Sequence, residues 1–289
     1  MKSHSPRRQN WRKVTNLIML SLTGLATILV VAPLIWIIGY VIREGLPAID
    51  LKFFTELPTP VGVPGGGIVN ALVGSLMTVG LGLVIAVPVG TLAGIYAATH
   101  ADKFLGTLLR FGTDVISGVP SIVMGIFAYT LIVLPQRHFS AFSGGIVLAF
   151  IMVPTIVRST EEMIRLVPNS LREGSLALGA PEWKTSFSVI LPAALNGVIT
   201  GIMLAIARAA GEAAPMLFTA FGNPFMNANY DQPVSTLPHM IFVYAIAPYD
   251  DWHAKAWATA LVLITLVLLL NVGARLLVWW RTRQLGSLK

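Results

Sequence analysis

Long stretches with few or no charged residues alternate along the chain with short segments that carry most of its charges. Six apolar runs stand out, at residues 17–42, 68–99, 115–134, 145–157 (extended back to about residue 141), 192–219 and 256–280. At about 1.5 Å per residue, a helix of roughly 20 residues crosses the hydrocarbon core of a membrane. The pattern therefore predicts an all-α integral membrane protein with six transmembrane helices.

The first run, 17–42, could also be interpreted as a secretory signal, because it follows a basic tail. It is about twice as long as the apolar region of a signal peptide, and no small-residue cleavage site ends it. We therefore expect an uncleaved first transmembrane helix.

The basic residues are distributed unevenly between the two sides that six helices would define. About 15 Lys and Arg lie in the tail 1–16, the links 99–114 and 158–184, and the end of the chain from Arg275 onward. The segments on the other side hold only four, namely Arg43, Lys52, Arg137 and Lys255. Because cytoplasmic loops carry the excess of basic residues, both termini are predicted to be cytoplasmic, which requires an even number of spans.

Composition supports the membrane class and narrows the chemistry. The chain is 55% hydrophobic and 11% charged, well below the charged fraction of soluble domains. Its net charge of +7 comes from basic residues scattered between apolar runs, which indicates topology rather than a nucleic-acid surface. There is no cysteine, the five histidines are widely spaced, and no phosphate-binding loop motif occurs. We expect no metal site and no cofactor.

These observations predict the following organisation of the chain. It comprises a cytoplasmic tail 1–16, a first transmembrane helix 17–42, a turn-rich extracytoplasmic loop 43–67, a permease core 68–280 with a cytoplasmic loop 158–184, and a cytoplasmic tail 281–289. Within the core, the polar segment 220–255 is predicted to be a solvated external loop that contacts a partner.

The loop 158–184 carries eight charges in 27 residues and contains its own short helix. Ser170 and Glu173 have the spacing of a capping box, and Gly179 suits the end of a helix over 171–178. A helix this short needs a surface to lie against. That surface is either a soluble partner, which we favour, or the lipid interface.

A motif in this loop resembles the signature of ATP-binding-cassette (ABC) importer permeases. Glu173-Gly174-Ser175, then Gly179, then 189–192 (Val-Ile-Leu-Pro) match an E-A-A-x3-G-x9-I-x-L-P pattern, with Gly and Ser replacing the two alanines and Val the isoleucine. The resemblance implies the type I, MetI-like permease fold and a helix that couples the permease to ATP-binding subunits. The residues implied in coupling are Ser170, Arg172, Glu173, Gly174, Ser175 and Gly179.

The fifth run contains an arginine and a glutamate at membrane depth. Arg208 and Glu212 are four residues apart and share one helix face. A buried charge is costly and usually faces a bundle interior or a watery path, and a guanidinium suits the oxygens of an oxyanion. We therefore predict an anion pathway, in which Glu212 balances the charge of Arg208 when no anion is bound. The alternative is an ion pair that only fixes how the helices pack. Hydroxyls of Ser117, Ser121 and Thr130 could line the same path or bond their own backbone.

Residues 205–220, from Ala-Ile-Ala-Arg to Leu-Phe-Thr-Ala, resemble the fifth helix of the PstA family of phosphate transport permeases. Further similar stretches lie at 54–56, 65–72, 93–96, 119–125 and 166–173. The resemblance implies phosphate import by alternating access in the inner membrane. It also implies a homologous PstC-like permease, two PstB-like ATP-binding subunits and an extracytoplasmic PstS-like phosphate-binding protein as partners.

Three other functions remain open from the residues alone. The same kind of permease could carry sulfate or molybdate, since Arg208 does not distinguish these oxyanions. An intramembrane enzyme would need a nucleophile with a base or a metal cluster, and we find no such pairing, so ATP hydrolysis is expected on partner subunits. A passive channel would not need the coupling motif.

Overall fold

The computed structural model describes residues 6–286, and its regular elements are all helical apart from one isolated bridge between Phe221 and Val234. The elements are α1 Pro6–Gly45, η1 Leu46–Ala48, α2 Leu51–Thr55, α3 Val69–Thr99, α4 Phe104–Gly118, α5 Ser121–Ala128, η2 Tyr129–Val133, α6 Leu134–Gln136, α7 Ala141–Arg165, α8 Asn169–Ala177, α9 Glu182–Thr185, η3 Ser186–Ile190, α10 Leu191–Ala210, α11 Ala214–Thr219, α12 Leu237–Ala245 and α13 Asp250–Gly286.

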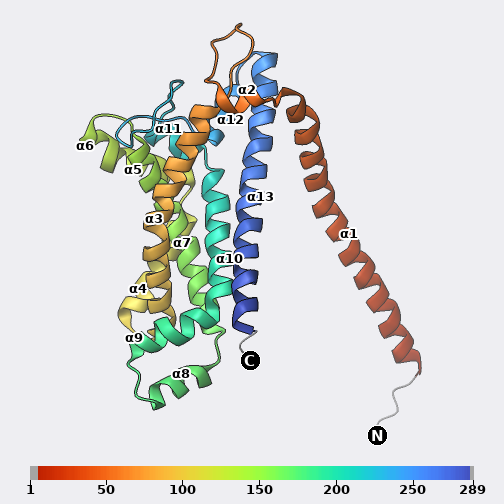
Figure 1. The fold of residues 1–289 in the computed structure, drawn as a ribbon. Coiled ribbons are helices and arrows are strands. Elements are labelled where there is room, and N and C mark those ends of the chain that lie inside the picture. The colour runs from red at the N-terminus through yellow and green to blue at the C-terminus, as the bar shows by residue number, and fades with distance from the viewer. Residues whose placement is uncertain (1–5, 287–289) are drawn as a thin grey trace.

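Within the described chain, five helices are long and apolar enough to cross a membrane, and a sixth crossing results if the bent α4–α5 pair forms one span. The start of α1, the short helix α8 and the end of α13 lie at the same end of the molecule (Figure 1). This arrangement agrees with the predicted topology, in which both termini lie on the side of the coupling loop. The predicted tails 1–16 and 281–289 extend beyond the described residues.

The third apolar run, 115–134, does not form one straight helix. The chain bends by 104° between α4 and the helical segment that begins at Ser121. Pro120 has no N–H to continue the ladder of α4, and Val119 before it takes an extended conformation with ψ 129°. The break separates Ser117 from Ser121.

The boundaries of the fifth run also differ from the prediction of 192–219. The helix begins at Glu182 and runs without interruption to Ala210. Gly211 is the residue that caps its end. Pro215 lies in the first turn of α11, where a missing N–H is tolerated. Arg208 is therefore in the last turn of its helix and Glu212 is beyond the end, so the prediction that the two share one helix face is wrong.

The prediction that 220–255 is a solvated loop is wrong as well. The segment contains α12, and Leu237 at its start is fully buried. The backbone N–H of Leu237 donates to the hydroxyl of Ser75 on α3, at 2.8 Å. Apolar residues placed among Asn and Asp let this segment fold back onto the bundle.

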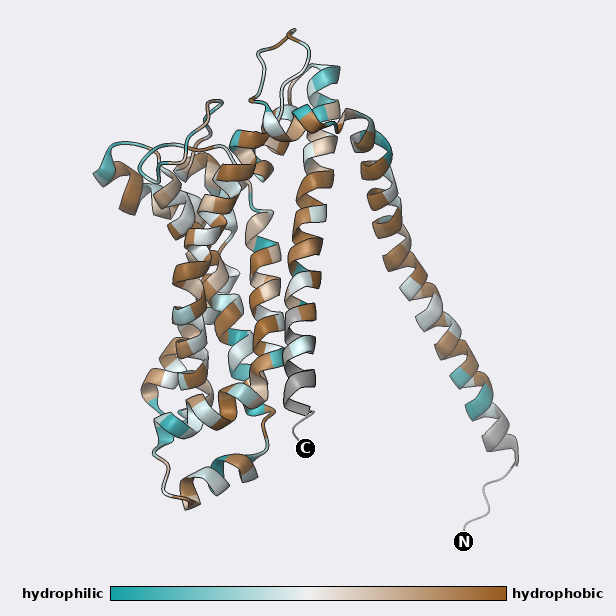
Figure 2. Ribbon diagram, viewed as in Figure 1, coloured by the Kyte–Doolittle hydropathy of each residue, from teal (hydrophilic) through white to brown (hydrophobic). Residues whose placement is uncertain are grey.

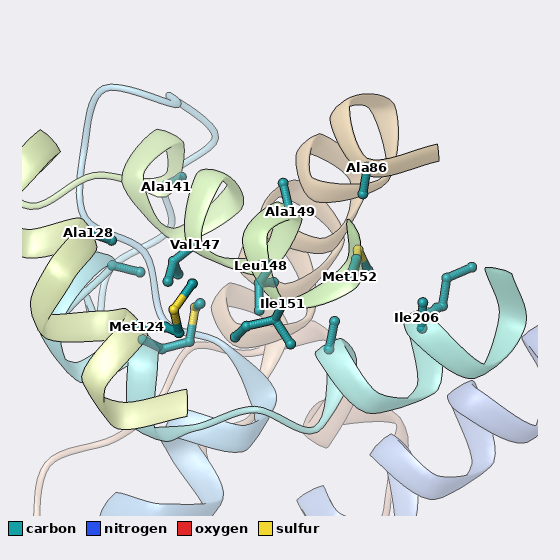
Figure 3. Close-up of a cluster of buried hydrophobic side chains, with 14 of the residues drawn as sticks. Ala86, Met124, Ala128, Ala141, Val147, Leu148, Ala149, Ile151, Met152 and Ile206 are labelled. Carbon is teal, nitrogen blue, oxygen red and sulfur yellow. The ribbon is translucent and has the colours of Figure 1, made fainter. Parts of the chain in front are cut away.

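The core lies between α3, α5, α7 and α10, and its residues include small side chains and methionines (Figure 3). Glycines allow α3 and α7 to approach closely. A Cβ added to Gly90 would lie 2.8 Å from the Ile156 Cβ, and one added to Gly94 would lie 2.6 Å from the Thr160 Cβ. Close backbone approach through small residues is typical of helix packing in membranes.

Helix α1 differs from the other long helices because it stands apart from the bundle (Figure 1). Its most apolar stretch is only 6% buried, although hydrophobic residues occur all along it (Figure 2). An apolar helix with so little cover from its own chain requires lipid or another protein around it.

Candidate substrate pathway and coupling segment

Arg208 and Glu212 form an open ion pair where α10 ends. The Arg208 Nε lies 3.8 Å from the Glu212 Oε1, and the two side chains are 51% and 18% exposed. This distance exceeds that of a hydrogen bond. Within the described chain no side-chain hydrogen bond involves the Arg208 guanidinium, so its donors remain available to another group.

Three of the four predicted pathway residues share one small cavity. It is lined by Arg208 of α10, Ser117 at the end of α4 and Ser121 at the start of α5. The remaining lining residues are mostly apolar and comprise Ile116, Val119, Met124, Ile151 and Pro154. The cavity thus combines one guanidinium and two hydroxyls within an apolar wall. Thr130 is different, since its hydroxyl donates to the Ile126 carbonyl at 3.0 Å.

The α4–α5 break creates this cavity. After the bend at Pro120, α5 packs against α11, the segment that follows Arg208 and Glu212. The two backbones are so close that a Cβ added to Gly125 would lie 2.7 Å from the Pro215 Cα. The two interrupted regions of the chain therefore support each other at the level of the arginine.

Glu212, the fourth predicted residue, lines a neighbouring pocket. Its polar neighbours there are Ser75 and Thr78 of α3 and Thr236 before α12. The Thr236 hydroxyl is buried and has no hydrogen-bond partner within the described chain. Such a group usually pairs with ordered water. No local sequence pattern points to these hydroxyls, because they come from distant segments.

A second, tighter charge cluster lies outside the predicted site residues. Glu161 on α7 is only 4% exposed, and its Oε1 lies 2.6 Å from both the Arg110 Nε and the Arg165 Nη2. Arg110 also donates to the Ala97 carbonyl at 2.6 Å. Asp114 and Arg158 pair nearby, again between α4 and α7. The spacing of 158, 161 and 165 is helical, but the sequence predicts a loop there because the fourth apolar run stops at its first charged residue.

The short helix of the coupling loop is present, with a start that differs from the prediction. It spans Asn169–Ala177 and begins after Pro168, without a side-chain cap. The predicted capping box of Ser170 and Glu173 is therefore wrong, since Ser170 is already inside the first turn. The predicted C-terminal glycine is confirmed, as Gly179 has φ +82°, a conformation that glycine adopts without strain.

Most of this helix faces away from the protein. Arg172 and Ser175 are partly buried, whereas its other residues are exposed, including the predicted coupling residues Ser170, Glu173 and Gly174. Leu178 just beyond the helix is 91% exposed. In Figure 1, α8 projects beyond the end of the bundle, separated from α3 and α7. Its free face is thus available to a partner.

Among the described residues, no group of three His, Asp or Glu side chains lies close enough to hold a metal ion. The polar groups of the site are instead hydroxyls, one guanidinium and one carboxylate. Groups of this kind are able to bind an anion by charge and hydrogen bonding.

Residues 90–281 match the family model of the binding-protein-dependent transport system inner membrane component. The phosphate transport system permease protein PstA of Yersinia pestis is 41% identical, over 94% of this chain and 92% of its own. The protein of the same name from Haemophilus influenzae is also 41% identical, over 96% of this chain and 98% of its own. PstA 1 of Mycobacterium tuberculosis is 32% identical, over 94% of this chain.

The chain belongs to the PstA family of phosphate transport system permeases. A solved structure of the inward-facing methionine ABC transporter MetNI shows the same fold, with a TM-score of 0.59 at 20% identity over 73% of this chain and 93% of that chain. The predicted MetI-like permease fold is thereby confirmed. As a PstA-family permease, the protein is a multi-pass protein of the inner membrane.

Proposed function

We propose that this chain is the permease subunit of an ATP-driven importer that moves inorganic phosphate across the inner membrane by alternating access. The observation that carries the proposal is the cavity in which Arg208, Ser117 and Ser121 meet. A guanidinium with unused donors and two hydroxyls matches the acceptor oxygens of a tetrahedral oxyanion. Family membership supports phosphate as that oxyanion.

In this mechanism Arg208 binds the passing anion and Glu212 balances its charge when the path is empty. The carboxylate lies 3.8 Å away, which is close enough for electrostatic balance and too far for a bond that the anion must break. The anion therefore enters an electrically balanced site and is released from it readily. Ser117 and Ser121, which line the same cavity, would offer it hydroxyl hydrogen bonds.

The second part of the proposal concerns α8 and the partner subunits that would drive transport. The exposed face of α8 would dock onto ATP-binding subunits, which hydrolyse ATP while this chain performs no covalent chemistry. A PstC-like permease would provide the other half of the path, two PstB-like subunits the energy, and a PstS-like binding protein the anion at the external face. Exposed Glu173 on α8 and exposed Leu178 just beyond it support this docking role.

Uptake of labelled phosphate, in cells that depend on this chain, tests the substrate. Unlabelled phosphate should compete and sulfate or molybdate should not; competition by sulfate at equal concentration would refute phosphate as the specific substrate. The substitution Glu173→Lys tests the docking role. It should separate ATP hydrolysis from uptake, and an unchanged ratio of the two would remove α8 from the coupling path.

A further inference from the structure

Helix α8 is attached to the rest of the described chain through one face. Arg172 and Ser175, its two partly buried residues, are three positions apart and so lie on the same side. Both reach α9. The Ser175 and Thr185 hydroxyl oxygens are 2.9 Å apart, and the Arg172 Nη2 lies 3.9 Å from the Glu182 Oε1. Of the two contacts, the hydrogen bond is the closer, and the ion pair is exposed to solvent and correspondingly weak.

The attachment point belongs to the helix that carries Arg208. Helices α9, η3 and α10 form one uninterrupted helix from Glu182 to Ala210. In Figure 1, its first part crosses the end of the bundle before the chain rises as α10. A displacement of α8 that pulls on Thr185 therefore acts on the helix whose last turn holds the guanidinium.

The surroundings of Thr185 suit a point where force is transmitted. The residue is 1% exposed, so water does not compete with its hydrogen bond as it does at a surface. It directly precedes η3, a five-residue π-helical segment over Ser186–Ile190. Such π segments inside longer helices are often associated with functional sites.

Ser175 stands at a position where the importer signature has alanine, which has no side-chain hydrogen-bonding group. The preceding Gly174 also replaces an alanine and makes the helix less stable by itself. The two departures fit together. A helix weakened by Gly174 depends on outside contacts for its position, and Ser175 provides one that alanine lacks.

We propose that the Ser175–Thr185 hydrogen bond links the coupling helix mechanically to the helix that bears Arg208. Thr185 is then a positioning residue for transport, because it acts through α8 and α10 rather than on the anion itself. This inference rests on the proposed docking of ATP-binding subunits to α8. It assigns the transmission of their motion to one hydrogen bond.

The test uses the complete transporter reconstituted in liposomes, with inorganic phosphate taken up and ATP hydrolysed measured together. Thr185→Val and Ser175→Ala each remove one hydroxyl. Each should lower the phosphate moved per ATP about fivefold, the effect of an ordinary hydrogen bond, with the KM for phosphate unchanged. The double variant should be no worse than either single one, because both changes delete the same bond.

Thr185→Ser and Ser175→Thr retain the hydroxyls and should restore the normal ratio, which a loss of packing alone would not predict. Ser188→Ala, an exposed serine three residues beyond Thr185, is the matched control. An unchanged ratio in both single variants, or losses that add in the double variant, would overturn the proposal. If Thr185→Val does not fold, Ser175→Ala still decides, since alanine is the signature's own residue.

Failure of the docking role gives a different result. In that case Glu173→Lys leaves the binding and activity of the ATP-binding subunits unchanged. If docking is correct and only the link is wrong, Glu173→Lys disturbs them while Ser175→Ala and Thr185→Val leave phosphate per ATP at the normal value.

Discussion

The molecule contains two arginine–glutamate sites of similar composition and opposite construction. At the end of α10, Arg208 and Glu212 are 3.8 Å apart, and the arginine is half exposed. Between α4 and α7, Glu161 is almost fully buried. Its Oε1 lies 2.6 Å from the Arg110 Nε and 2.6 Å from the Arg165 Nη2. In the second site the arginine N–H groups donate to acceptors of the same chain, and one N–H of Arg110 donates to the Ala97 carbonyl.

The difference shows how the same residue types serve two purposes. A buried carboxylate with two arginines at hydrogen-bond distance fixes the relative position of the helices that supply them, since removal of any member leaves an uncompensated charge. An arginine whose counter-charge lies beyond hydrogen-bond distance keeps its donors for a visiting anion. Burial and distance, rather than sequence spacing, separate the structural site from the site proposed for transport.

The largest effect is expected from Arg208→Gln. Loss of the guanidinium should lower phosphate uptake by about a hundredfold, in line with the loss of a charge-assisted hydrogen bond to the anion. The amount of membrane-inserted, assembled protein should stay normal. Uptake assays combined with blue native electrophoresis measure both. Arg43→Gln, at an arginine whose side chain is 82% exposed, is the control. Loss of assembly would instead favour a packing role for Arg208.

The next effect is expected from Glu161→Ala and should appear in stability. Removing the carboxylate leaves Arg110 and Arg165 without their shared partner. We expect a loss of about 2 kcal/mol, below the value for fully buried pairs because the two arginines are 24% and 49% exposed. Thermal unfolding in detergent measures it. Glu162→Ala, at the neighbouring exposed glutamate, should change the unfolding temperature little. Equal shifts in both variants would contradict a structural role for Glu161.

A smaller effect is expected from Glu212→Gln. Without the carboxylate, the arginine holds its anion longer, so uptake should fall about tenfold, equivalent to about 1.4 kcal/mol. Thermal stability should be nearly normal because the pair is open. Uptake at saturating phosphate, measured beside the melting temperature, separates the two quantities. A large drop in stability would place Glu212 with the structural site.

The smallest effect concerns an exposed pair outside the membrane-spanning helices. His138 Nε2 lies 3.0 Å from Asp231 Oδ1, and this hydrogen bond, with a second to the Gln136 carbonyl, raises the pKa of His138 above its usual 6.5. The stabilisation is therefore complete below about pH 6.5 and is lost as the pH rises through the higher, folded-state value. Hydrogen exchange over 224–232, corrected for intrinsic rates, should show slightly more protection at pH 6 than at pH 8. His138→Gln should remove that dependence.

The sequence by itself determined the membrane class, the orientation of the termini, the coupling motif and the nearness of Arg208 to Glu212. These properties depend on local information, namely the length of apolar runs, the side on which basic residues accumulate, and helical spacing. Gly179 belongs with them, because the helix-ending role of glycine comes from its own backbone freedom.

Only the tertiary structure decided how these parts meet. The break at Pro120 and the close packing of Gly125 on Pro215 bring Ser117 and Ser121 to Arg208. Segment 220–255 folds back onto α3, although its composition indicated a solvated loop. Such contacts join residues far apart in the chain, and their formation depends on how well distant surfaces fit together. The sequence indicated that an arginine would lie in the membrane, and the packing of the interrupted helices determined what surrounds it.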